Sequence, residues 1–333
     1  MKQHFILFLG IILVLNACQN AASKYIYNKG FVYGTMYSIT YESPNGKDFQ
    51  KEIDEQFSKY NMIFSTYQKE ATISKINNNV QVTPEPVFME CYNRAMEISE
   101  ITNGAFDITA GPMVNAWGFG PDEKKKMTQE KVDSLIEITG YHKIKIENGK
   151  FVKAYPEMKL DMSAIAKGFT SDLIANFLAE KGCTNYMVEI GGEVVAKGKN
   201  AKGKIWSIGI SKPDEDLLAS NSDLQAVIEL KDKGMATSGN YRNFYVEDGK
   251  KYAHTIDPKT GYPVQHSLLS ATVLANDCMT ADAFATAFMV LGKNMGIEIA
   301  RQVPGLEIFF IYADENGENQ VYMSEGFGEY LRK

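Results

Sequence analysis

A carboxylate and a hydroxyl lie four residues apart, at Asp282 and Thr286, in a segment rich in Ala and Met. This composition predicts a helix over 277–291, with Thr280 as its N-cap and Gly292 as its end. Residues four apart share one helix face, so both oxygens lie near the positive end of the helix dipole. Two such hard ligands suit Mg²⁺ better than a soft metal. The alternative is a plain capping turn, because Asp is common near helix N-termini.

A second charged segment begins where a short apolar element ends at Asp161. The apolar spacing that follows predicts a helix from about Ser163 to Lys181. The free N–H groups of a helix N-terminus attract anions, and Lys167 in the first turn adds a positive charge that suits a phosphate. In the alternative interpretation Asp161 and Ser163 only cap the helix, and Lys167 is solvated. Gly168 destabilises a helix interior, which indicates close packing at that position.

His254 stands at the end of a predicted hairpin over 245–255, before a segment, 256–263, that contains Pro and Gly. A histidine held beside such a rigid loop can act as a general base. The alternative is a packing and hydrogen-bonding role, which is common for histidine.

Two further segments have unusual compositions. The segment 104–112 places small residues around Phe106 and Asp107. That pattern suits either a close approach of the backbone to a ligand or a plain turn. The segment 235–243 is predicted to be a polar loop that is rich in hydrogen-bond donors.

The remaining periodicity predicts elements that position these residues. Helices are predicted over 49–64, 87–101 and 132–138, in addition to the two above. Single strands are predicted over 33–41, 185–190, 193–198, 205–210, 224–230 and 269–274. Hairpins are predicted over 143–152, 245–255 and 306–323. Many hairpins indicate an α+β fold with mixed, largely antiparallel sheets, helices packed outside and a ligand cleft between two sub-regions.

The composition is that of an ordinary globular protein, with 333 residues, 44% hydrophobic and 23% charged. The net charge is −6 and no basic tract is present, so nucleic acid is not expected as a partner. Cys91, Cys183 and Cys278 are an odd number with no Cys-x-x-Cys spacing, which argues against a disulfide framework or a structural zinc site. The histidines do not form a His-Glu-x-x-His motif, which argues against a zinc hydrolase.

The N-terminus has the features of an export signal. Lys2 is followed by an apolar run over 5–15, too short for a convincing membrane span, and then by Leu15-Asn16-Ala17-Cys18. This tetrapeptide resembles a bacterial lipobox, whose cysteine is lipidated. We therefore expect a lipoprotein signal peptide over 1–18, a polar tether over 19–29 and a folded domain over 30–333. The protein is then anchored through Cys18 to a membrane that faces the periplasm. A plain secretory signal is the alternative.

Seven stretches, taken in order, resemble the ApbE family of FAD:protein FMN transferases, and together they span nearly the whole chain from about Gly30. Each stretch is weak alone, but their order makes the resemblance specific. They are Tyr33-Gly34-Thr35, Ser65-Thr66-Tyr67, 104–109, 160–168, 237–243, 254–263 and 280–286.

The resemblance implies a cleft that binds FAD and a Mg²⁺ ion. The positions implied around FAD are Tyr33, Tyr67, Ala105, Phe106, Asp107, Asp161, Lys167 and Ile256. Asp282 and Thr286 are implied to hold the ion, which a backbone carbonyl near Ala164 and the diphosphate complete. His254 matches the candidate base of the family.

The implied reaction transfers FMN from FAD to a Thr or Ser hydroxyl of an acceptor flavoprotein and releases AMP. Acceptors of the family carry an Asp-x-x-Ser/Thr-Gly-Ala-Ser/Thr signal and are typically subunits of respiratory ion-pumping complexes. One alternative is a Mg²⁺-dependent FAD pyrophosphatase, which would use the same residues with water as the acceptor. Another is a flavin-binding lipoprotein without catalysis, but such a protein needs neither the metal pair nor His254.

Overall fold

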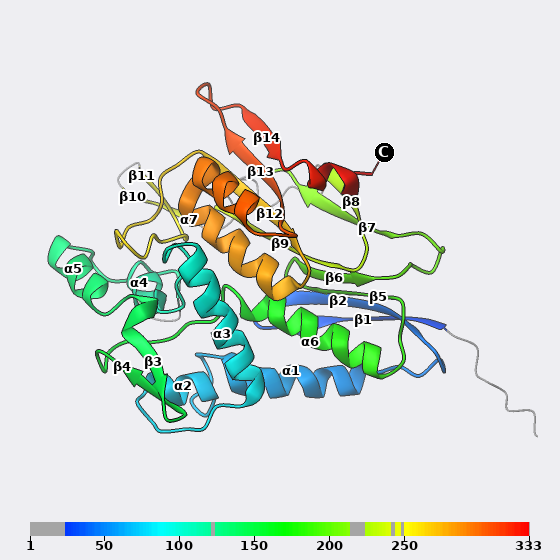
Figure 1. The fold of residues 1–333 in the computed structure, drawn as a ribbon, viewed down its shortest axis with the longest axis horizontal. Coiled ribbons are helices and arrows are strands. Elements are labelled where there is room, and N and C mark those ends of the chain that lie inside the picture. Colours follow the sequence, from blue (N-terminus) through cyan, green and yellow to red (C-terminus); the bar gives the residue numbers. More distant parts are fainter. Residues whose placement is uncertain (1–23, 121–123, 214–223, 241–243, 248–249, 333) are drawn as a thin grey trace, which may run out of the picture.

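The computed structural model describes residues 24–120, 124–213, 224–240, 244–247 and 250–332 (Figure 1). Its centre is an eight-stranded sheet of order β1-β2-β5-β6-β9-β12-β13-β14, in which all neighbouring pairs are antiparallel. The α+β prediction with a largely antiparallel sheet is therefore confirmed. The strands are β1 Lys24–Val32, β2 Thr35–Ser43, β5 Tyr186–Ile190, β6 Glu193–Lys197, β9 Lys233–Gly239, β12 Leu268–Ala275, β13 Glu307–Ala313 and β14 Asn319–Met323.

Helices cover one face of this sheet, and α6 and α7 lie directly against it (Figure 1). Their apolar side chains form the main core with inward-facing residues of the strands, among them Ile39, Val188 and Phe310. The longer helices are α1 Gln50–Phe64, α3 Pro86–Ile101, α6 Ala166–Glu180 and α7 Cys278–Gln302. The layer of helices thus places the two chemically suggestive segments, in α6 and α7, against the strands.

The other face of the sheet is covered at β6, β9 and β13 by a hairpin of β7 Trp206–Ser211 and β8 Leu224–Leu230, together with the 3-10 helix η2 Gly326–Tyr330. Trp206 and Phe327 pack there against Met235 and Phe309. Side chains on both faces of β13 are therefore covered, which explains its apolar run Ile308-Phe309-Phe310-Ile311.

The smaller elements are α2 Thr72–Asn77, α4 Gly111–Ala116, α5 Gln129–Glu137, η1 Tyr141–Lys143 and the hairpins β3 Ile144–Glu147 with β4 Lys150–Lys153 and β10 Phe244–Glu247 with β11 Lys250–Ala253. They include short helices that pack on other helices, α2 on α1 and α4 on α5. The hairpin predicted over 143–152 is confirmed, and its Asn148-Gly149 turn has the positive φ angles (51° and 74°) that this dipeptide favours.

Two predicted boundaries near the N-terminus are wrong. Residues 24–29, predicted as part of a tether, belong to β1, where they pair with β2. The strand predicted from Tyr33 begins at Thr35, because Tyr33 and Gly34 form the tight turn between β1 and β2 with φ of 51° and 76°. The sequence of this edge strand contains several Lys and Tyr residues and does not by itself predict a strand. Its pairing with β2 stabilises the extended conformation.

The polar loop predicted over 235–243 is wrong over its first half, where β9 runs in the middle of the sheet. Its hydroxyls are accommodated because Thr237 lies opposite Thr272 of β12 and the two side-chain oxygens are 2.9 Å apart. Residues 241–243 lie outside the described part.

The five predicted helices are present and differ from the prediction only at their ends, whereas the short helices α2 and α4 were not predicted. Asp277, and not Thr280, caps α7, since its carboxylate accepts the Thr280 N–H at 2.7 Å. Gly292 leaves helical geometry as predicted (φ 74°, ψ 178°), but a second helical run continues to Gln302. The helix predicted from Ser163 begins at Ala166.

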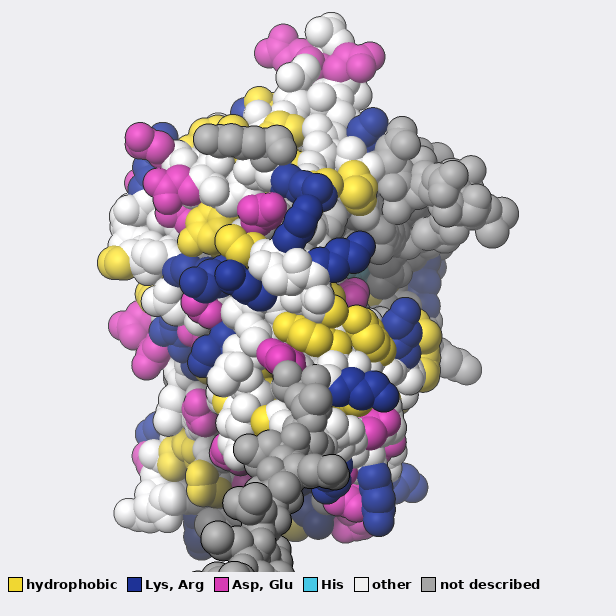
Figure 2. Space-filling view, turned by 90° about the vertical axis from the view of Figure 1, so that its right-hand side faces the viewer, with side chains coloured by type: hydrophobic (Ala, Val, Ile, Leu, Met, Phe, Trp, Pro, Cys, Tyr) yellow, Lys and Arg dark blue, Asp and Glu magenta, His cyan; other side chains and the backbone are white. Residues whose placement is uncertain are grey.

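The predicted signal peptide and Cys18 lie outside the described residues. None of the helices that the structure describes is both long enough and apolar enough to cross a membrane. Figure 2 shows one side of the molecule, on which Lys and Arg side chains lie among acidic and apolar ones. Lysines are dense in the β6–β7 connection, where residues 197, 199, 202 and 204 are exposed lysines. This connection lies beside the start of β1, because the Tyr25 hydroxyl donates to the Lys199 carbonyl at 2.8 Å.

Candidate functional site

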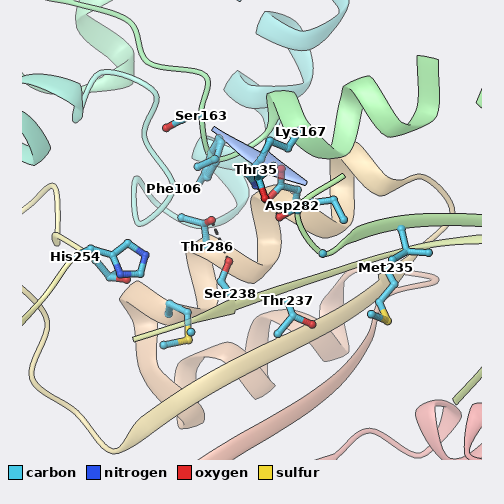
Figure 3. Close-up of a pocket in the computed structure, with 18 of the residues that line it drawn as sticks. Thr35, Phe106, Ser163, Lys167, Met235, Thr237, Ser238, His254, Asp282 and Thr286 are labelled. Carbon is cyan, nitrogen blue, oxygen red and sulfur yellow. Dashed lines mark hydrogen bonds and ion pairs between the residues drawn. The ribbon is translucent and has the colours of Figure 1, made fainter. Parts of the chain in front are cut away.

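A pocket of about 960 Å³ opens at the end of the sheet where the β5–β6 turn and the end of β9 meet α7. Its walls come from segments far apart in the sequence: 105–114, 161–167, β5 to β7, β9, 254–258 and α7. Figure 3 shows that Lys167 and Asp282 lie on one side of the pocket and His254 on the other, with Ser238 and Thr286 between them.

Asp282 is the most deeply buried acid of the pocket, with 2% of its surface exposed. One carboxylate oxygen, Oδ2, accepts the Gly168 N–H at 3.0 Å, and the other, Oδ1, lies 3.8 Å from Lys167 Nζ. Burial raises the pKa of Asp282, while Lys167 and the Gly168 N–H oppose that rise. Oδ1 therefore has no close hydrogen-bond donor in the described structure.

Thr286 lies one helical turn beyond Asp282 and also lines the pocket, as its spacing predicts. Its hydroxyl is 3.4 Å from the Ser238 hydroxyl of β9 (Figure 3). The α7 segment can approach α6 closely because Gly168 has no side chain; a Cβ there would lie 2.4 Å from the Cys278 carbonyl oxygen and 2.7 Å from Asp282 Cβ. The close packing predicted for Gly168 is confirmed.

Lys167 turns inward from the first turn of α6 and is not the solvated residue of the alternative interpretation. Its Nζ donates to Glu193 Oε1 at 2.6 Å. Burial alone would lower the pKa of Lys167, but the carboxylates of Asp282 and Glu193 raise it above its ordinary value. Burial raises the pKa of Glu193 to about 7, although Lys167 opposes the rise. One ammonium group thus lies between two buried carboxyl groups.

His254 follows β11 and is half-buried at the pocket wall. Its ring lies 6.3 Å from the Phe119 ring in an edge-on arrangement. The next residues are fixed by hydrogen bonds: the Thr255 hydroxyl donates to Asn240 Oδ1 at 2.6 Å, and the Val264 N–H donates to the Thr255 carbonyl at 3.0 Å. The loop therefore holds the imidazole in a defined place opposite the acidic side.

The segment 105–109 forms a compact turn at the mouth of the pocket. Asp107 lines the pocket, but its Oδ1 accepts from the Thr109 N–H (2.8 Å) and hydroxyl (2.6 Å), and its Oδ2 accepts from the Tyr141 N–H (2.8 Å). Burial raises the pKa of Asp107, and these hydrogen bonds oppose the rise. The carboxylate therefore fixes the turn, which leaves Ala105 and Phe106 to present the surface of the pocket.

Asp161 joins this turn to the start of α6. Its N–H donates to the Ile108 carbonyl at 2.7 Å, and its Oδ1 accepts the Ser163 N–H at 2.8 Å. Gly111 lets it pack closely, since a Cβ at that position would lie 2.9 Å from Asp161 Cβ. Asp161 and Ala164 both line the pocket.

Comparison with known proteins gives a family for the chain that has this pocket. A model of the ApbE family matches residues 33–310. The chain belongs to the ApbE family. It is 37% identical to the FAD:protein FMN transferase of Vibrio cholerae serotype O1, over 99% of this chain and 100% of that protein. It is 40% identical to the FAD:protein FMN transferase of Haemophilus influenzae, over 94% of this chain and 93% of that protein.

Solved structures of ApbE proteins have the same fold as this chain. The flavin transferase ApbE from Vibrio cholerae superimposes with a TM-score of 0.84 at 36% identity, over 93% of this chain and 100% of that one. The apo form of the Pseudomonas stutzeri flavinyl transferase ApbE has a TM-score of 0.80 at 28% identity, over 93% of this chain and 98% of that one.

Most of the residues that the ApbE resemblance implies for the site meet in this pocket. They are Ala105, Phe106, Asp107, Asp161, Ala164, Lys167, His254, Ile256, Asp282 and Thr286. Ile256 also packs on Trp117 in a small apolar cluster, which ties the loop of His254 to α4.

The two tyrosines of the ApbE resemblance do not line the pocket with these residues. The Tyr33 hydroxyl donates to the Phe57 carbonyl at 3.1 Å, so this side chain turns toward α1. Tyr67 lies in the turn after α1 and is 72% exposed. Both positions were chosen by motif alone, and neither motif fixes the direction of the side chain.

Sequence reasoning missed Glu193 and Ser238, which both line the pocket. Glu193 follows Gly191-Gly192, whose φ angles of 66° and 103° make the tight β5–β6 turn. A buried acid directly after a Gly-Gly turn was the available signal. Ser238 was hidden in a segment that was predicted to be a loop.

Proposed function

We propose that this protein is a Mg²⁺-dependent FAD:protein FMN transferase, which moves FMN from FAD to a Thr or Ser hydroxyl of an acceptor flavoprotein. The proposal rests on similarity along almost the whole chain to transferases of that name. The observation that carries it is the pocket itself, where buried Asp282 and half-buried Thr286 face His254 across a pocket of about 960 Å³.

The residues present fit a magnesium ion. Asp282 and Thr286 offer a carboxylate and a hydroxyl, the hard oxygens that Mg²⁺ prefers, and among the described residues no donor lies closer to Asp282 Oδ1 than Lys167 Nζ at 3.8 Å. No group of three His, Cys, Asp or Glu side chains suited to a metal occurs among the described residues. A carbonyl near Ala164, the diphosphate and water would complete the ligands of the ion. When bound, the ion supplies charge neutralisation for the diphosphate and the leaving AMP.

The protein side chains have separate roles in this reaction. The acceptor hydroxyl oxygen forms a bond to the FMN phosphorus, and the bond from that phosphorus to the oxygen of the departing AMP phosphate breaks. His254 accepts the proton of the acceptor hydroxyl, and AMP carries away the electron pair of the broken bond. Lys167 adds positive charge beside the diphosphate.

The rest of the pocket orients FAD and excludes water. Phe106 and Ile256 contribute apolar surface, and Asp107 and Asp161 hold the backbone around it. If water entered in place of the acceptor hydroxyl, the same site would release free FMN and AMP. The balance between transfer and hydrolysis therefore depends on how completely the acceptor closes the pocket.

The proposed acceptor carries the Asp-x-x-Ser/Thr-Gly-Ala-Ser/Thr signal, as in subunits of respiratory ion-pumping complexes. We place the enzyme at a membrane that faces the periplasm, anchored through lipidated Cys18. The lysines of the β6–β7 connection support contact of this side of the molecule with the lipid surface. They lie beside the start of β1, a few residues from Cys18, and lysines near an anionic lipid surface favour its contact.

Intact-mass spectrometry tests the proposal. The full chain, purified in detergent, is mixed with FAD, Mg²⁺ and an acceptor domain that carries the signal. We expect the acceptor to gain the mass of one FMN, and the gain to vanish when the acceptor Thr is replaced by Ala. An unmodified acceptor with free FMN and AMP would instead establish the pyrophosphatase. Intact FAD and an unmodified acceptor would refute the enzymatic proposal for that acceptor, and a second acceptor sequence then decides between catalysis and binding.

A further inference from the structure

The most unusual group in the pocket is the trio of Lys167, Glu193 and Asp282, which come from α6, β6 and α7. Lys167 Nζ is 2.6 Å from Glu193 Oε1 but 3.8 Å from Asp282 Oδ1. The first distance is a charge-assisted hydrogen bond, and the second is too long for one. The single cation of the trio is thus shared unequally between its two acids.

We propose that Glu193 is a positioning residue that holds Lys167 away from Asp282 and so leaves Asp282 Oδ1 open to a divalent cation. The inference rests on the proposed function because it takes Asp282 as the metal ligand. It assigns to Glu193 a role that acts through Lys167, without contact between Glu193 and the reacting atoms.

The first argument is the mobility of Lys167. A lysine ammonium sits on a flexible four-carbon stem, so a shift of about 1 Å toward Asp282 needs only small rotations. The Lys167 side chain is 31% exposed, and in the absence of Glu193 the nearest carboxylate for its ammonium group would be Asp282 at 3.8 Å. A direct ion pair would then occupy the oxygen that the cation requires.

The second argument is the way in which Glu193 is held. It begins β6, pairs with Ile190 across the Gly191-Gly192 turn and is only 4% exposed. The Ser171 hydroxyl donates to its backbone carbonyl at 3.2 Å, which fixes β6 against α6. The strand pairing and the packing against α6 hold the backbone that carries the carboxylate, so a movement of Lys167 toward Asp282 would lengthen its bond to Glu193.

The third argument is what the carboxylate does not do. Its second oxygen, Oε2, is buried without a hydrogen-bond partner in the described structure. A buried carboxylate with a purely structural role normally has both oxygens satisfied. The hydrogen bond to Lys167 is therefore the main interaction of the Glu193 carboxylate. The negative charge of Glu193 also offsets the repulsion between Lys167 and a cation bound at Asp282.

Metal binding tests the inference without any turnover. Mn²⁺ is titrated into the full chain in detergent without FAD, and free Mn²⁺ is followed by electron paramagnetic resonance. The variants are Glu193→Gln, Lys167→Met and the double variant. Glu189→Gln is the matched control, because Glu189 also lines the pocket but no hydrogen bond or ion pair to Lys167 is found in the described structure.

We expect Glu193→Gln to raise the Kd for Mn²⁺ about tenfold and Glu189→Gln to change it less than about twofold, since only the first frees Lys167 to pair with Asp282. Adding Lys167→Met should restore the Kd of Glu193→Gln to within about threefold of wild type, whereas Lys167→Met alone should change it little. This non-additivity distinguishes positioning from a simple loss of negative charge.

Several outcomes would overturn the inference. One is a Glu193→Gln chain that melts normally and binds Mn²⁺ as tightly as wild type. Another is an equal decrease in the Kd for Mn²⁺ when Lys167→Met is added to the wild-type chain and to Glu193→Gln. That result would indicate that Lys167 acts only through its positive charge. Failure of the metal site itself gives a different result: the wild-type chain would show no saturable Mn²⁺ binding, or Asp282→Ala would leave that binding unchanged.

Discussion

The two sides of the pocket are held by different kinds of structure. On the acidic side, Asp282 sits on a helix that is locked to its neighbour. The Asp172 carboxylate of α6 accepts the N–H groups of Cys278 and Met279 at 2.9 and 2.8 Å, and Gly168 lets α6 touch α7. The side chains on this side of the pocket are thus carried by two helices that pack into the main core.

On the histidine side, a loop carries the imidazole of His254. Its backbone is fixed by local hydrogen bonds, such as Asp257 N–H to the Tyr262 carbonyl (2.9 Å), and by the Trp117 indole, which donates to the Gly261 carbonyl at 2.8 Å. Few of these contacts reach the main core. The comparison teaches that substitutions on the helix side should alter stability and chemistry together, whereas those on the loop side should alter chemistry alone.

Asp282→Ala should have the largest effect, because it removes the one carboxylate of the proposed metal site. We expect transfer of FMN to fall by about 10³-fold or more, which corresponds to the several kcal/mol that a metal supplies to a charged transition state. The initial rate of acceptor modification, followed by intact mass, measures this. Asp133→Ala, an exposed carboxylate on α5, is the control and should keep the wild-type rate. Wild-type transfer by Asp282→Ala would remove the acidic side from the mechanism.

His254→Ala tests the loop side. We expect transfer to fall about 10²- to 10⁴-fold, the range for loss of a general base, while the melting temperature stays close to that of wild type. Added imidazole should restore part of the rate. The exposed His142 on η1 provides the control variant, His142→Ala. If His254→Ala lowered stability as much as Asp282→Ala, the contrast between the two sides would fail.

Sequence alone predicted best those features of the pocket that lie within one element. The spacing of Asp282 and Thr286 is a local pattern, so their shared helix face follows from 3.6 residues per turn. Gly168 within a helical pattern was enough to predict a close contact between helices. Such signals lie within one element and need no knowledge of the partner.

Features that depend on distant partners could not be predicted. Thr237 and Ser238 are polar and suggest a loop, but the pairing of Thr237 with Thr272 stabilises a central strand. Glu193 forms its hydrogen bond with Lys167, which is 26 residues away in sequence. Tyr33 was placed by its motif, but the turn between β1 and β2 directs its side chain toward α1. In each case tertiary contacts overrode the local preference.

Gly168→Ala sharpens the comparison by disturbing the helix side without removing a functional group. A Cβ at this position would meet the Cys278 carbonyl oxygen at 2.4 Å, and backbone cannot yield cheaply. We expect a loss of about 1–3 kcal/mol in the free energy of unfolding, as for other overpacked cores. Mn²⁺ affinity should fall in parallel. Gly328→Ala is the control, since nothing lies within 4 Å of its Cβ position. Equal denaturation midpoints for both variants would show that α6 and α7 can separate freely.

Asp172→Asn should have the smallest effect on stability. We expect this effect to appear as a change in the pH dependence of the free energy of unfolding. Burial raises the pKa of Asp172 from 3.8 to about 7, although the Cys278 and Met279 N–H groups oppose the rise. The folded chain therefore binds this proton more tightly than the unfolded chain. Its stabilising contribution is complete below about pH 4 and is lost as the pH rises through 7.

The difference in unfolding free energy, wild type minus Asp172→Asn, should therefore decrease from pH 4 to pH 7 in urea titrations. Asp133→Asn, an exposed carboxyl group, controls for general effects of charge. A difference that increases with pH would mean that the two N–H bonds outweigh burial and that an ionised carboxylate caps α7. In that case Asp172 would carry its negative charge at neutral pH despite the repulsion of Asp277 and Glu90, and charge-assisted hydrogen bonds would hold the start of α7.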